Sequence, residues 1–133
     1  MSIDMTTSMT TSTDTDTGTW TAVCAATLLT PDRGVAALVN GRAVAIFALS
    51  TGSLHAIDNI DPCSGASVLS RGMIGDVDGV ATVASPMYKQ RFDLSTGCCL
   101  DIPGLSVAVH DVTSAGGMIH VRMRPTAAVA GAR

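Results

Sequence analysis

Residues 35–58, which read VAALVNGRAVAIFALSTGSLHAID, decide the fold of this chain. Short runs rich in Val, Ile and Ala alternate here with the turn pairs Asn40-Gly41 and Thr51-Gly52. A type I′ turn needs positive φ at two successive residues, which Asn and Gly adopt at little cost, so Asn40-Gly41 predicts a tight hairpin. The run from Ala43 to Leu49 is apolar on both faces, which is typical of a central strand. The stretch therefore predicts three consecutive antiparallel strands.

The same alternation of short apolar runs and turn pairs continues along the chain, with further turn signals at Asp78-Gly79, Thr96-Gly97 and Gly116-Gly117. The clearest strand is residues 118–124, where apolar and polar side chains alternate as in a half-buried strand. No segment between turns has the roughly ten residues that a helix requires. We expect strands at about 20–25, 35–39, 43–49, 53–58, 73–77, 80–84, 90–94, 98–101, 107–113 and 118–124. This pattern predicts an all-β fold, an antiparallel sandwich or small barrel built from hairpins.

Composition divides the 133 residues into one domain and two tails. Residues 1–19 are rich in Thr and have little to bury, so we expect a disordered tail there. Residues 125–133 are Ala-rich and predict a second loose tail, which leaves residues 20–124 as the folded domain. No secretory signal precedes the Thr-rich run, and the longest unbroken apolar run, Ala43 to Leu49, is 7 residues. We therefore expect a cytoplasmic location.

The charge of −3 comes from the N-terminal tail. Three of the 11 acids, Asp4, Asp14 and Asp16, lie in the first 19 residues, which leaves 8 acids (11 − 3) against 8 bases beyond them. A near-neutral domain lacks the basic stripe of a nucleic-acid-binding protein. It also lacks the positive charge that attracts a protein to an anionic membrane. Neither nucleic acid nor a membrane is expected as a partner.

Four cysteines, Cys24, Cys63, Cys98 and Cys99, could form disulfides, bind zinc or remain free. Without a secretory signal, disulfides lack an oxidising compartment. Adjacent Cys98 and Cys99 would point to opposite faces of a strand and could not share one metal site. We expect reduced thiols in the interior. His55, His110 and His120 have no partner at ligand spacing, so we expect surface or hydrogen-bonded side chains, with His120 facing solvent.

Two longer loops interrupt the hairpins, and each begins with an X-Pro pair. The first, residues 61–72, reads DPCSGASVLSRG, and the second, residues 85–97, reads SPMYKQRFDLSTG. Long loops on a rigid β scaffold are where binding residues usually lie. Asp61 and Arg71 could form an ion pair that holds the first loop closed.

The two loops resemble those of a Rieske [2Fe–2S] domain, which have the forms C-P-H-x-G-x-x-L and C-P-x-H-x-x-x-F-D-L-x-T-G. In that family each loop supplies one Cys and one His to the cluster. The prolines and the segment FDLSTG match, but the four ligand positions hold Asp61, Cys63, Ser85 and Tyr88. Only Cys63 in this set could bind iron strongly, and one ligand does not hold a two-iron cluster. The resemblance implies a Rieske-like fold without metal ligation.

Taken together, the two loops and residues 20–124 are similar to the small subunits of bacterial assimilatory NAD(P)H-dependent nitrite reductases. This resemblance implies an accessory, non-catalytic chain that holds no cofactor and docks on a large subunit. The large subunit would carry FAD, a [4Fe–4S] cluster and sirohaem, and would reduce nitrite to ammonium. Two alternatives stay open: a Rieske-type ferredoxin that carries electrons through a [2Fe–2S] cluster, and a free-standing β binding module.

The second loop also suggests a partner surface. Tyr88, Lys89, Gln90 and Arg91 place two bases and an aromatic ring on one loop tip, and Tyr and Arg are favoured interface residues. We include Arg71 of the first loop in this predicted surface. In the alternative interpretation, Tyr88 fills the volume of the missing cluster and the bases are merely solvated.

Overall fold

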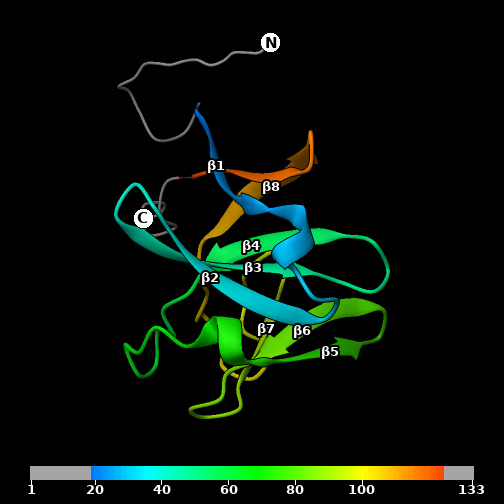
Figure 1. The fold of residues 1–133 in the computed structure, drawn as a ribbon. Helices are drawn as coiled ribbons and strands as arrows, with labels where there is room; N and C mark the ends of the chain where they lie inside the picture. The colour runs from blue at the N-terminus through cyan, green and yellow to red at the C-terminus, as the bar shows by residue number, and fades with distance from the viewer. Residues whose placement is uncertain (1–18, 125–133) are drawn as a thin grey trace.

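A computed structural model of the chain describes residues 19–124, and Figure 1 shows an antiparallel β architecture. The strands are β1 (Trp20–Ala25), β2 (Arg33–Val39), β3 (Arg42–Ala48), β4 (Leu54–Asp58), β5 (Met73–Val77), β6 (Val80–Ala84), β7 (Arg91–Asp93), β8 (Val109–Ala115) and β9 (Met118–Arg122). Two short 3-10 turns, η2 (Ala26–Leu28) and η3 (Leu69–Arg71), were not expected from the sequence. The two expected tails lie outside the described residues, apart from Thr19.

Two sheets make up the domain. One has six strands in the order β1-β9-β8-β4-β3-β2, and the other has three in the order β5-β6-β7. All registered pairings are antiparallel, as the hairpin pattern predicts. In Figure 1 the three-stranded sheet lies below β2, β3 and β4, and the β8–β9 hairpin lies above them. Within residues 19–124, no helix has the length and apolar character needed to cross a bilayer.

Two hairpin turns have the backbone conformation that their residue types predict. Asn40 and Gly41 have φ of 52° and 80°, and Asp78 and Gly79 have φ of 53° and 86°. Both pairs therefore adopt the two positive φ angles of a type I′ turn. They set the registers of β2 with β3 and of β5 with β6.

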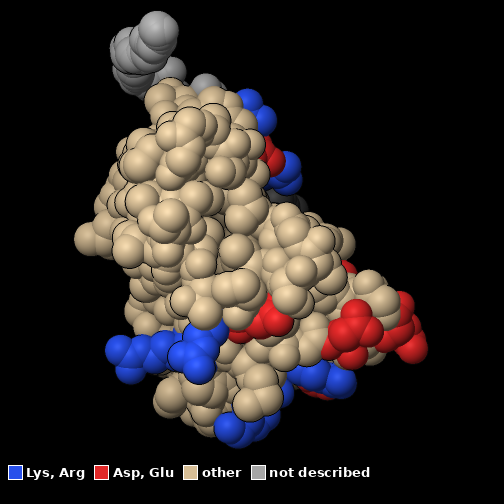
Figure 2. All heavy atoms as spheres, turned by 45° about the vertical axis from the view of Figure 1, so that its right-hand side comes forward, with Lys and Arg blue, Asp and Glu red and all other residues tan. Residues whose placement is uncertain are grey.

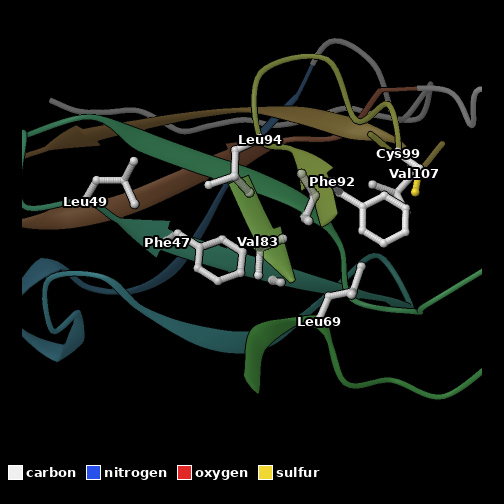
Figure 3. Packing of buried hydrophobic residues seen from close by; sticks show 10 residues of the cluster. Phe47, Leu49, Leu69, Val83, Phe92, Leu94, Cys99 and Val107 are labelled. Atoms are coloured by element: carbon white, nitrogen blue, oxygen red, sulfur yellow. The ribbon is translucent and has the colours of Figure 1, made fainter. Parts of the chain in front are cut away.

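Strand β3 contributes to two hydrophobic clusters, one on each face of the six-stranded sheet. Ala45 and Phe47 belong to the cluster that faces the small sheet, where Phe47 lies near Val83 and Leu69 in Figure 3. Val44 and Ile46 belong to the other cluster, packed against β9. Alternate residues of one strand thus enter different cores, which explains why this run is apolar on both faces.

The expected strand at 98–101 is wrong. Cys98 and Cys99 form only isolated bridges, to Ser106 and Phe92 respectively. The chain turns at residues 101–104, where Pro103 has no N–H to donate and Gly104 has φ of 83°. The turn ends the pairing before a ladder can form, and the next strand, β8, begins at Val109 rather than at 107.

Candidate functional site

The two proline loops lie side by side and are joined by the Asp61 side chain. The first loop follows β4 and is closed by the bridge between Ile60 and Ser67. The second connects β6 to β7 and is closed by a hydrogen bond from the Ser85 N–H to the Gln90 carbonyl, 2.9 Å. The first loop therefore passes from the six-stranded sheet to the three-stranded sheet, whereas the second loop begins and ends on strands of the three-stranded sheet.

Asp61 is fully buried and its carboxylate accepts three hydrogen bonds. Oδ2 accepts from the Ser85 hydroxyl at 2.6 Å, and Oδ1 accepts from Gln90 Nε2 at 2.8 Å and from the Cys63 N–H at 2.8 Å. Ser85 Oγ in turn accepts from the Met87 N–H at 3.1 Å. We call Asp61, Ser85 and Gln90 the inter-loop cluster. It satisfies a buried carboxylate with donors from both loops, which is the condition for such a group to stay inside a protein.

The four positions that match the Rieske ligands divide into two pairs. Asp61 and Ser85, at the cysteine positions, are buried and hydrogen-bonded to each other, which leaves no space between their side chains for iron. Cys63 and Tyr88, at the histidine positions, are exposed. Residues 19–124 contain no group of three or more His, Cys or Asp side chains arranged to hold a metal ion. The residues present do not fit a [2Fe–2S] cluster, which requires soft thiolate and imidazole ligands.

The predicted partner residues differ in their exposure and in their contacts. Tyr88 is 63% exposed and Lys89 is exposed beside it, with a φ of 65°. Arg91 is exposed but forms a two-pronged ion pair with Asp101. Arg71 ends η3 and lines a separate groove on the molecule.

One prediction about the loops and two possibilities that the sequence left open are wrong. Gln90 is 4% exposed and bonded to Asp61, so it cannot meet a partner. Tyr88 does not fill a buried volume between the loops, because its side chain is 63% exposed. Asp61 and Arg71 do not pair, since Asp61 is buried and its oxygens are bonded to the inter-loop donors.

The sequence analysis assigned Gln90 to the partner surface and missed its inward-facing role, although a signal for that role was present. Gln90, Phe92 and Leu94 occupy alternate positions, and all three are buried. The period of two through the apolar Phe92 and Leu94 predicts that Gln90 also points inward. A buried Gln needs a partner, and the nearest candidate would then have been the other loop.

The cysteines are all free, as expected, but two of them are not in the interior. Cys63 and Cys98 are exposed, Cys24 is half-buried, and only Cys99 is buried in the core. The expectation fails because Cys63 lies in a turn and Cys98 forms only an isolated bridge, so neither belongs to a strand.

The histidines give a mixed outcome. His110 is a buried, hydrogen-bonded side chain, whose Nδ1 accepts from the Arg124 N–H at 3.0 Å while Nε2 lies 2.8 Å from Asp58 Oδ1. His120 is half-buried rather than facing solvent. Burial alone would raise the pKa of Asp58, but His110 and Arg42 outweigh it and lower that pKa.

Asp101 is another carboxyl group with a lowered pKa. The Arg91 side chain, together with the Arg91 N–H, lowers the pKa of Asp101 from its usual value to about 2. This pair ties the start of β7 to the turn after Cys98 and Cys99, at an exposed position. It holds the Arg91 guanidinium in place beside the second loop.

Comparison with known proteins places this geometry in a family. The family model described as a Rieske-like [2Fe–2S] domain matches residues 19–122. The chain is 42% identical over 104 residues to the nitrite reductase (NADH) small subunit of Salmonella typhimurium, which covers 77% of this chain and 96% of that protein. A crystal structure from Mycobacterium tuberculosis, assigned as an NADH-dependent nitrite reductase small subunit, is 47% identical with a TM-score of 0.77, over 80% of this chain and 96% of that one.

A further match lies inside a longer protein. A stretch of 78 residues, 59% of this chain, is 40% identical to part of the nitrite reductase (NAD(P)H) large subunit of Klebsiella oxytoca, where it makes up 8% of the length. The all-β prediction, the Rieske-like loops and the resemblance drawn from them are thus confirmed. The chain belongs to the family of nitrite reductase small subunits, which have a Rieske-like domain.

Proposed function

We propose that this chain is the accessory small subunit of a cytoplasmic NAD(P)H-dependent nitrite reductase, and that it holds no cluster of its own. Its role is to dock on the large subunit, which carries FAD, a [4Fe–4S] cluster and sirohaem and reduces nitrite to ammonium. The observation that carries the proposal is the inter-loop cluster. Where a Rieske domain needs two thiolates, this chain has a buried Asp61–Ser85 hydrogen bond of 2.6 Å.

The match inside the Klebsiella oxytoca large subunit supports docking. A domain like this one is there covalently part of a chain that is named as a nitrite reductase large subunit. Two domains that share one chain stay at high effective concentration, whereas separate chains need a binding surface to achieve the same proximity. We infer that this chain supplies such a surface.

The tips of the two loops form the best candidate for that surface. Met87 is 47% exposed and Tyr88 63% exposed, and the exposed Cys63 and Lys89 belong to the same two tips. We call Cys63, Met87, Tyr88 and Lys89 the loop-tip surface. Below it, the inter-loop cluster fixes both loops, so little conformational freedom is lost when a partner binds. Tyr and Met are enriched at interface centres, where they bury large areas.

The first test is the metal content of the purified chain. We expect a colourless protein with no stoichiometric iron or acid-labile sulfide, because the four ligand positions cannot hold a cluster. Iron analysis and the visible spectrum measure this directly. Stoichiometric iron with a reduced-state EPR signal would contradict the proposal and favour the Rieske-type ferredoxin instead.

The second test is the affinity for the large subunit of the same organism. Replacing Tyr88 and Lys89 together with alanine is expected to weaken binding by about tenfold or more, because a central aromatic side chain carries about 1–2 kcal/mol or more of interface energy. Calorimetry or surface plasmon resonance measures the dissociation constant. Leu28→Ala is the matched control, since Leu28 is also 63% exposed but lies in η2, away from the loops. A wild-type chain that does not bind the large subunit would favour the free-standing binding module.

A further inference from the structure

A groove of about 620 Å³ lies between the starts of β2 and β5. Residues 32–34 form one wall and residues 70–74 form the other. In Figure 1 the first residues of β2 pass just above β5. Both strands are sheet edges, so neither has a second neighbour within its sheet on the outer side. The groove is large enough for a segment of another chain, because ligand sites commonly measure about 300–1,000 Å³.

Two glycines allow the backbone segments that form the groove walls to pack closely. A Cβ atom at Gly34 would collide with the Ser70 carbonyl oxygen and the Phe47 ring. A Cβ atom at Gly72 would collide with the Ala84 carbonyl oxygen. Backbone therefore packs against backbone on both sides of the groove, and the groove is formed before anything binds.

Unpaired positive charge is concentrated in this groove. Of the basic side chains in residues 19–124, four form ion pairs with aspartates: Arg42, Arg91, Arg122 and Arg124. The remaining three in that range are Arg33, Arg71 and Lys89, and the two arginines both line the groove. Asp32 also lines it, with Oδ1 accepting from the Ser50 N–H at 2.9 Å. Figure 2 shows bases and acids close together on the lower half of one face, and further bases with an acid at its upper right edge.

The backbone of the groove favours a peptide over a small anion. The N–H groups of Arg33, Ser70, Arg71 and Gly72 all donate within the chain, at 2.6–3.0 Å. They cannot form the nest of N–H donors that binds a free phosphate. The guanidinium groups of Arg33 and Arg71 remain available as donors. Their planar sets of N–H groups match the two oxygens of a carboxylate. Met73, 78% exposed, adds an apolar contact on the β5 wall.

We propose that this groove binds an extended, Asp- or Glu-rich segment of the large subunit, with carboxylates paired to Arg33 and Arg71. This inference rests on the proposed function, because it names the partner's chemistry at a second contact. The edge of β5 can pair with an extended backbone, as sheet edges do with added strands. The loop-tip surface and the groove then form two separate contacts with one partner.

A decaglutamate peptide tests the groove directly. Titrated into the full chain and followed by ¹H–¹⁵N NMR, it should shift the amides of residues 32–34 and 70–74 and bind more weakly as salt is added. The double variant Arg33→Gln/Arg71→Gln should bind at least about tenfold more weakly, since both charge-assisted contacts are lost. Arg122→Gln/Arg124→Gln removes the same charge outside the groove and should bind like the wild type. Equal losses in the two double variants, or inorganic phosphate saturating the same amides as tightly as the peptide, would overturn the proposal.

Binding to the large subunit separates this inference from the proposed function. The double variant Arg33→Gln/Arg71→Gln should bind the large subunit more weakly than the wild type, while Leu28→Ala should not. If the double variant binds as tightly as the wild type, the groove inference fails and the proposed function stands. If the wild-type chain does not bind the large subunit at all, both fail.

Discussion

Replacing Asp61 with alanine is expected to lower the free energy of unfolding by about 3–5 kcal/mol. The substitution removes the acceptor of three hydrogen bonds from Ser85, Gln90 and Cys63, in a place where Asp61 itself is fully buried. Each donor left without a partner inside a protein costs about 1–3 kcal/mol. Urea unfolding followed by circular dichroism measures the change, and the thermal midpoint should fall with it.

Two further variants show whether the cost comes from the buried cluster. Asp61→Asn keeps one acceptor oxygen and nearly the same volume, so it should lose clearly less stability than Asp61→Ala. Asp101→Ala removes a carboxylate that also accepts three hydrogen bonds, but from Arg91 at an exposed position, and should leave the stability close to that of the wild type. An Asp61→Ala variant as stable as Asp101→Ala would show that the inter-loop cluster does not hold the loops together.

The inter-loop cluster also connects stability to the docking proposed for the loop-tip surface. Its members connect the two loops through hydrogen bonds to the Asp61 carboxylate. Hydrogen bonds to a buried carboxylate are directional, so they fix the positions of the loops and not only their distance. A partner that binds the loop tips therefore meets a surface that is already ordered.

The fold was predictable because its signals are local. Positive φ at Asn40-Gly41 and Asp78-Gly79 follows from residue type alone, and the alternation along residues 118–124 assigns each side chain to a face. The apolar run of β3 predicts a strand buried on both sides, and the sheet order places it between β4 and β2. Even at 98–101, where the expected strand is wrong, the Pro103-Gly104 pair that ends the pairing is visible in the sequence.

The site was less predictable, because its contacts join residues far apart in the chain. Asp61 lies 24 positions from Ser85 and 29 from Gln90, and no local pattern states that these three meet. Sequence comparison with the Rieske motif identified Asp61 and Ser85 as ligand positions but not as partners of each other. The groove was unpredictable for the same reason, since Arg33 and Arg71 come together only when β2 and η3 pack.

The second large loss of stability is expected when Gly97 is replaced with alanine. Gly65 has a closely similar backbone conformation, so Gly65→Ala is the matched comparison. Both have positive φ, 81° and 77°, and both donate their N–H to the carbonyl four residues earlier, at 2.7 Å. They differ in their surroundings. A Cβ atom at Gly97 would collide with the Val107 carbonyl oxygen, whereas a Cβ atom at Gly65 would have no neighbour within 4 Å. Comparing the two alanine variants therefore separates the backbone conformation from the close approach of two segments.

Gly65→Ala is expected to cost about 1–2 kcal/mol, the penalty of an alanine in the left-handed region. Gly97→Ala carries the same penalty plus about 1–3 kcal/mol for the collision, because a backbone carbonyl cannot move aside as a flexible side chain can. The Val107 N–H also donates to the Gly97 carbonyl at 2.9 Å, so any shift that relieves the collision weakens this bond. Urea unfolding of the two variants side by side gives the difference. Equal losses would mean that the second loop tolerates a displacement from Val107, and that the packing of this segment against the six-stranded sheet does not stabilise the domain.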